Sequence, residues 1–85
     1  MKKNIKENVW LRINHNSKKV NVLKDPTDET PEIVTSLTLE SKFKMINSTP
    51  FYGFNDKPYV KIQTDNMYEG YVLEESIDVG GRKNG

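Results

Sequence analysis

Residues 59–73 read Tyr-Val-Lys-Ile-Gln-Thr-Asp-Asn-Met-Tyr-Glu-Gly-Tyr-Val-Leu, and they predict a β-hairpin. Apolar and polar side chains alternate over 59–63, which is the period of a half-buried strand. Asp65-Asn66 is a candidate for the turn, and Gly-Tyr-Val-Leu at 70–73 predicts the returning strand. We therefore expect this part of the chain to form β-sheet.

More strands are predicted before this hairpin. Apolar residues alternate with other types over 9–14, and they do so again over 20–23, after the polar turn 14–17. Apolar residues then recur at short spacing from 33 to 46, and the segment 76–79 could close the sheet. Two long loops are expected. One is 25–31, whose two prolines exclude a central strand, and the other is 47–58.

These signals predict a single all-β domain. Five to six short antiparallel strands, separated by Gly, Pro and Asn, are typical of a small barrel or sandwich. We place this domain at residues 9–79, with a flexible basic arm at 1–8 and a flexible tail at 80–85. The expected core consists of Val20, Val22, Ile33, Leu37, Phe43, Met45, Ile62, Val72 and Ile77.

The composition excludes several classes of protein. A chain of 85 residues is too short for two ordinary domains. It contains no cysteine, which excludes disulfides, cysteine zinc sites and thiol catalysis. No stretch approaches the roughly 18 apolar residues of a membrane span, so we expect no membrane contact. The N-terminal region lacks the apolar core of a signal peptide, so we expect synthesis in the cytoplasm, with secretion only if the chain is a fragment.

The charge of the chain is unevenly distributed. Residues 1–24 carry seven basic residues and one acid, a net charge of +6, whereas residues 25–85 carry six basic residues and eleven acids, a net charge of −5. The total of +1 argues against bulk electrostatic binding to nucleic acid. The basic region is either a solvated tail or an arm that meets an acidic surface, on a partner or on a second copy of the chain.

Five short pieces of the chain occur in a recognisable order. They are Val20-Asn21-Val22 with Asp25-Pro26-Thr27, Ile33-Val34-Thr35-Ser36-Leu37, Lys42-Phe43-Lys44-Met45-Ile46, Tyr59-Val60-Lys61-Ile62, and Asp65 to Gly70-Tyr71-Val72 with Ser76-Ile77. Over roughly residues 20–79, this order resembles the bacterial SH3 (SH3b) domain family. The resemblance implies an SH3-like barrel. It also implies a module that binds cell-wall peptide, acts as a spacer or contacts another protein.

The sequence departs from the pattern of the SH3b family at several positions. Glu40 stands where the family favours a turn glycine, and Tyr59 and Tyr71 stand where it favours tryptophan. The loop 47–58 is longer than the corresponding loop of the family. These changes fall at turns and amphipathic positions, so the expected fold is unaffected by them. They do affect the ligand that the resemblance implies.

The aromatic residues are the candidates for partner binding. Phe51, Tyr52 and Phe54 lie in the expected loop, where Phe51 or Phe54 could fold back to cap one end of the barrel. Alternatively, Tyr52, Tyr59 and Tyr71 form part of a groove that accepts an extended peptide. Trp10 points to the opposite side of its strand from Leu11, so it either packs on the exterior or anchors an interface.

The sequence does not predict catalytic residues, a metal site or a cofactor. His15, the only histidine, lies in an Asn-His-Asn turn, and the acidic loop around Asp25 lacks the spacing of a calcium loop. The aromatic-rich half is acidic, which argues against a nucleic-acid partner. We therefore expect a non-catalytic SH3-like module that binds protein or peptide, as a small component of a bacterial or bacteriophage assembly. The alternative is an SH3b module that targets peptidoglycan peptide.

Overall fold

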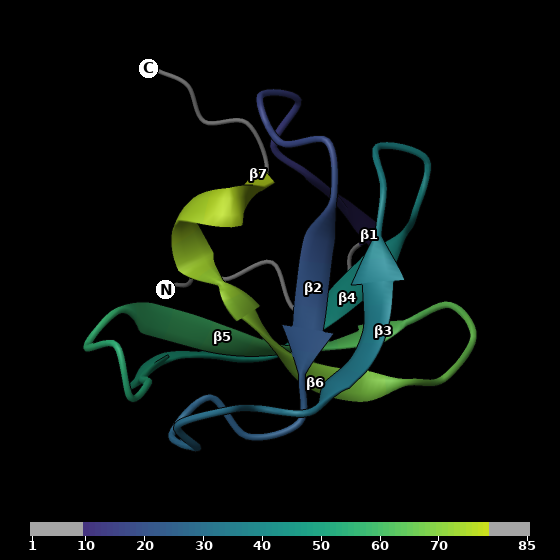
Figure 1. The fold of residues 1–85 in the computed structure, drawn as a ribbon. Coiled ribbons are helices and arrows are strands. Elements are labelled where there is room, and N and C mark those ends of the chain that lie inside the picture. The colour runs from purple at the N-terminus through teal and green to yellow at the C-terminus, as the bar shows by residue number, and fades with distance from the viewer. Residues whose placement is uncertain (1–9, 79–85) are drawn as a thin grey trace, which may run out of the picture.

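The computed structural model describes residues 10–78, which form one all-β unit (Figure 1). Its elements are β1 (Trp10–Ile13), β2 (Val20–Leu23), β3 (Ile33–Leu37), β4 (Phe43–Tyr52), β5 (Pro58–Thr64), β6 (Glu69–Leu73), the 3₁₀ turn η1 (Glu74–Ser76) and β7 (Ile77–Asp78). The expected arm at 1–8 and tail at 80–85 lie outside the described residues. No helix in the described part of the chain is long and apolar enough to cross a membrane.

The seven strands form one antiparallel sheet that curls into a half-barrel. Their order is β3-β2-β6-β5-β4-β1-β7, so β3 and β7 stand at its two ends. β2 and β3 run steeply across the β5–β6 pair in Figure 1, which places the core between the two parts of the sheet. The all-β prediction is thus confirmed.

The number of strands is larger than the five to six expected from the sequence. A tight turn separates β3 from β4. The amide of Ser41 donates to the carbonyl of Thr38 at 3.0 Å, and the Ser41 hydroxyl accepts from the Thr38 amide at 2.9 Å. This polar turn divides the apolar stretch 33–46 into two strands, and it contains Glu40, which stands at a turn position of the SH3b pattern.

The prediction of a loop at 47–58 is wrong over its first half. β4 continues to Tyr52 and pairs with β5 as far as Tyr52 opposite Pro58, so only residues 53–57 form the connection. The register shifts between Met45 and Asn47 and again between Asn47 and Phe51. Pro50 lies in the second irregular stretch, where proline is tolerated because the regular hydrogen-bond ladder is interrupted.

The core forms on the inner face of the curled sheet. Phe43, Val22, Val60, Ile62 and Val72 are completely buried there. The other expected core residues are buried too, with one exception. The prediction for Ile33 is wrong, because Ile33 begins the terminal strand β3 and remains 52% exposed. Sequence reasoning missed Leu11, Ile13 and Val60, which also belong to the core.

The two parts of the sheet meet where β6 passes β2. Leu23 opposite Tyr71 is the one register position that joins these strands in the described part of the chain. A Cβ at Gly70 would lie 2.5 Å from Val22 Cγ1 and 2.7 Å from the carbonyl oxygen of Leu23. Glycine is therefore required at position 70, because a side chain would push the two strands apart.

We expect Gly70→Ala to destabilise the fold by about 1–3 kcal/mol, the usual cost of an extra methyl group in a packed interior. Urea unfolding followed by circular dichroism measures this change. Ser36→Ala is a suitable control, since its hydroxyl bonds the Asn21 side chain on the exposed surface of β2–β3. A Gly70→Ala protein as stable as the control would contradict the close approach of β6 and β2.

Candidate functional site

One face of the sheet is turned away from the core and carries much of the aromatic surface. This outer face is formed by the side chains of β1, β4, β5 and β6 that alternate with the buried ones. Across it, Trp10 stands opposite Lys44, Lys44 opposite Gln63, and Gln63 opposite Glu69. Since directly paired residues of an antiparallel sheet project to the same side, these four side chains form one row.

Trp10 is the most prominent residue of the outer face. Its side chain is 47% exposed, whereas its neighbour Leu11 is buried, as the alternation predicts. The ammonium nitrogens of Lys44 and Lys42 lie 5.1 and 5.9 Å from the centre of its ring. These are cation–π distances, so the indole ring is held between two positive charges and still presents surface to the solvent.

Phe51 and Tyr71 form a second aromatic group on the same face. Their ring centres are 5.1 Å apart and the rings are tilted by 32°. Lys61 Nζ lies 5.9 Å from the Tyr71 ring centre and 3.9 Å from the Glu69 carboxylate. The sequence anticipated a cluster that contains Tyr71, but Phe51 rather than Tyr52 is its partner.

The end of β4 and the β4–β5 connection each present one further aromatic side chain to the solvent. Tyr52 is 58% exposed and Phe54 64% exposed. The Phe54 amide donates to the carbonyl oxygen of Pro26 at 2.7 Å, which ties the connection to the β2–β3 loop. The backbone at Phe54 folds back as one interpretation of the sequence suggested, but the Phe54 ring stays exposed and does not cap the end of the sheet.

Tyr59 is a packing residue. Only 6% of its surface is exposed, and its hydroxyl accepts a hydrogen bond of 3.0 Å from Asn55 Nδ2. A Cβ at Gly53 would approach Tyr59 Cε1 to 2.7 Å and the Pro26 carbonyl oxygen to 2.8 Å, so the connection lies tightly over this ring. Tyr59 thereby supports the positions of Phe54 and Pro26.

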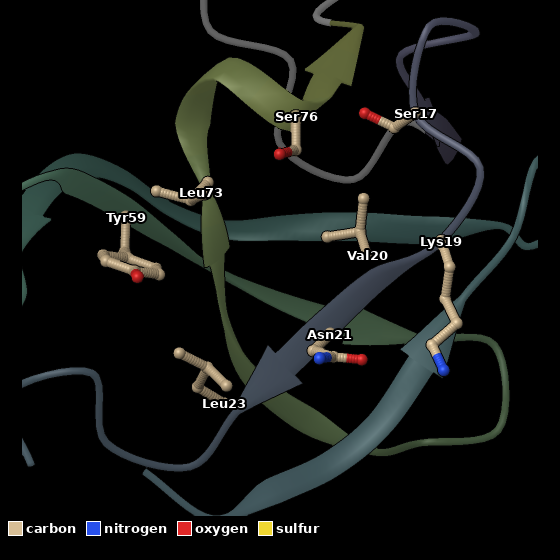
Figure 2. A pocket seen from close by; sticks show the side chains of 8 residues that line it. All are labelled: Ser17, Lys19, Val20, Asn21, Leu23, Tyr59, Leu73 and Ser76. Atoms are coloured by element: carbon tan, nitrogen blue, oxygen red, sulfur yellow. The ribbon is translucent and has the colours of Figure 1, made fainter. Parts of the chain in front are cut away.

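A groove opens where β2 diverges from β6 and η1 (Figure 2). Its volume is about 270 Å³, and its lining residues are Ser17, Lys19, Val20, Asn21, Leu23, Tyr59, Leu73 and Ser76. The side chains of Leu23, Tyr59 and Leu73 form an apolar side, and the two serines lie near each other at one end. Of these residues the sequence pointed only to Tyr59, because nothing in a local pattern shows where two strands separate.

The β2–β3 loop is ordered by hydrogen bonds from its own side chains. Asp25 Oδ1 accepts from the Thr27 hydroxyl at 2.6 Å and from the Thr27 amide at 3.0 Å. The hydroxyl bond first, and then the amide bond, lower the pKa of the Asp25 carboxyl from its ordinary value. This turn fixes Pro26, whose carbonyl oxygen receives the Phe54 amide.

The only histidine of the chain lies apart from the aromatic surface, in a solvent-exposed turn. His15 is exposed in the β1–β2 turn, and Glu74 and Glu75 are exposed in η1. In the same range, no three His, Asp or Glu side chains gather closely enough to hold a metal ion. The arrangement offers contact surface, namely exposed rings, flanking lysines and a small groove.

Comparisons with known proteins found no relative of this chain. No family, curated protein or solved structure matches the chain.

We expect Thr27→Val to raise the pKa of Asp25, because the hydroxyl donor is lost while the amide donor remains. The sign follows from the lowered pKa: ionised Asp25 stabilises the fold above its ordinary pKa, and this contribution is lost as the pH falls through the folded value. NMR titration of the Asp25 carboxyl carbon measures the change. Thr30→Val is the control, since Thr30 bonds Asp28 only through its amide. An unchanged Asp25 titration would show that the hydroxyl bond is not made in solution.

Proposed function

We propose that this chain is a non-catalytic, SH3-like interaction module of the SH3b type, which binds a protein or peptide partner as a small component of a bacterial or bacteriophage assembly. The observation that carries the proposal is the exposure of large aromatic side chains on an ordered sheet. Trp10, Phe51, Tyr52 and Phe54 are each more than 40% exposed. Tryptophan and tyrosine are the residue types that most often anchor protein interfaces.

The surroundings of these rings also favour a binding role. Two of the groups of rings lie beside lysines, Trp10 beside Lys44 and Tyr71 beside Lys61. Such a combination of apolar area and charge is typical of an interface that must be soluble before it meets its partner. The order of the five sequence pieces that resemble SH3b supports the family assignment.

A random-peptide display library tests this function. We expect peptides selected on the full chain to bind Trp10→Ala or Phe54→Ala at least about tenfold more weakly, because truncation of a hot-spot anchor costs about 2 kcal/mol or more. Both side chains are exposed, so neither change should alter the fold.

The matched control for the display experiment is Ile33→Ala, which removes an exposed apolar side chain from the other end of the sheet. It should bind the selected peptides as the wild type does. Selection of no peptide, or equal binding to all three variants, would contradict the proposed function.

The groove favours a second candidate, recognition of a cell-wall peptide. It is narrow, has one apolar side and ends in two serine hydroxyls, which suits a short extended peptide of small residues. Lys19 and Asn21 line it and are exposed, so they can be changed without disturbing the core, unlike the buried Tyr59.

Co-sedimentation with purified peptidoglycan tests this candidate. If the groove binds cell-wall peptide, the wild type and Lys18→Ala sediment with the polymer, and a protein with both Lys19→Ala and Asn21→Ala stays in the supernatant. Wild-type protein that remains in the supernatant would exclude the cell-wall function.

A further inference from the structure

Two exposed aromatic side chains of this chain lie in surroundings of opposite charge. Trp10 is flanked by Lys42 and Lys44, and Arg12 follows two residues later on the same side of β1. Phe54, in contrast, lies in a connection that is bonded to the acidic β2–β3 loop. The two surroundings are complementary in charge, and each has an apolar ring that a partner can cover.

The first surface, which we call the cationic face, has a net charge of +2. That charge counts four bases and two acids, namely Arg12, Lys42, Lys44, Lys61, Glu69 and Asp78, and leaves out Glu40 and Asp65, which border the face at its two neighbouring turns. Among the described residues, the one ion pair on this face joins Lys61 to Glu69. Lys42 and Lys44 therefore keep their charges available to an acidic partner.

The second surface, which we call the acidic end, consists of residues 24–32 and 53–57. It carries five acids, Asp25, Asp28, Glu29, Glu32 and Asp56, against Lys24 and Lys57, a net charge of −3. All seven side chains are exposed, and Phe54 is exposed among them. The Phe54–Pro26 hydrogen bond holds the two segments together, so their charges act as one patch.

The two surfaces cannot meet within one molecule. In the sheet, β6, β5 and β4 separate β2, which leads into the acidic loop, from β1, which carries Trp10. In Figure 1 the β2–β3 loop lies at the lower end of β2, well away from β1. A contact between the surfaces must therefore join two copies.

We propose that copies of this chain associate head to tail, with the cationic face around Trp10 of one copy on the acidic end around Phe54 of the next. This inference rests on the proposed function and names the partner as a second copy of the chain. Because a pair joined in this way still has one unused surface of each kind, the contact can propagate into a ring or a filament. Such growth is what a component of a larger assembly needs.

A protein surface suits the cationic face better than a nucleic acid does. The described residues carry eight bases and eleven acids, a net charge of −3, so a long phosphate chain would leave the face and run over acidic surface. The match in sign therefore favours the chain's own acidic end.

Light scattering behind size exclusion, on the full chain at two protein and two salt concentrations, is the first test. We expect the average mass to exceed the 9.8 kDa of one chain, to rise with protein concentration and to fall towards 9.8 kDa at high salt. A monomer under all four conditions would overturn the head-to-tail contact. The peptide display experiment would still test whether the chain is an interaction module, so failure of the head-to-tail contact and failure of the proposed function are distinguishable.

Charge reversal identifies the surfaces. Lys44→Glu and Glu29→Lys should each return the protein to 9.8 kDa, and an equimolar mixture of the two should regain about twice that mass, because each supplies the surface that the other lacks. Lys18→Glu and Glu75→Lys make the same changes in charge at exposed positions outside both surfaces, so both should associate like the wild type. Loss of association in these controls, or a mixture that stays monomeric, would overturn the proposal.

Trp10 also reports directly on what covers it, since it is the only tryptophan of the chain. We expect its fluorescence to change with protein concentration in the wild type and to stay constant in Glu29→Lys. Titration of dilute protein with a twelve-nucleotide oligothymidylate should leave the fluorescence unchanged. Quenching by the oligonucleotide in protein that stays monomeric would assign the face to nucleic acid and overturn the proposal.

Discussion

The contact of Gly70 with β2 is the constraint on which the rest of this structure depends. β2 and β3 on one side, and the five other strands on the other, are joined in one sheet by the position where Leu23 faces Tyr71. At that point the missing side chain of Gly70 leaves room for Val22. Because the strands touch there and then diverge, the sheet can bend sharply enough for its inner face to enclose the core. A domain this small has no second layer to cover that face.

The same divergence also creates the surfaces available for binding. Above the contact, β2 leaves β6 and the groove opens between Leu23 and Leu73. Below it, the β2–β3 loop extends far enough to receive the Phe54 amide on Pro26. Within residues 10–78 the outer face of the remaining strands is not covered, so Trp10, Phe51 and Tyr71 keep part of their surface in the solvent. Core formation and exposure of the aromatic rings are thus two consequences of one bend.

Sequence reasoning correctly predicted those features that depend on local pattern. Alternation identified the strands around Val22, Ile62 and Val72 and the outward direction of Trp10, because a strand side chain on one face excludes its neighbour from that face. It failed at Asn47–Tyr52, where bulges break the alternation, and at Ile33, whose burial depends on its place at the end of the sheet. The groove residues and the Phe51–Tyr71 pair come from segments far apart in the chain, and a local pattern does not contain their register.

Charge shows the same division between local pattern and fold. The sequence shows a basic first part and an acidic remainder, but strand order decides which charges become neighbours. Lys42 and Lys44 belong to the acidic part of the chain, and pairing of β4 with β1 moves them beside Trp10 and Arg12. The β4–β5 connection, which contains Phe54, is likewise brought to the acidic loop by a single backbone hydrogen bond. The fold therefore converts a gradient along the chain into two separate patches of opposite sign, each with an exposed ring.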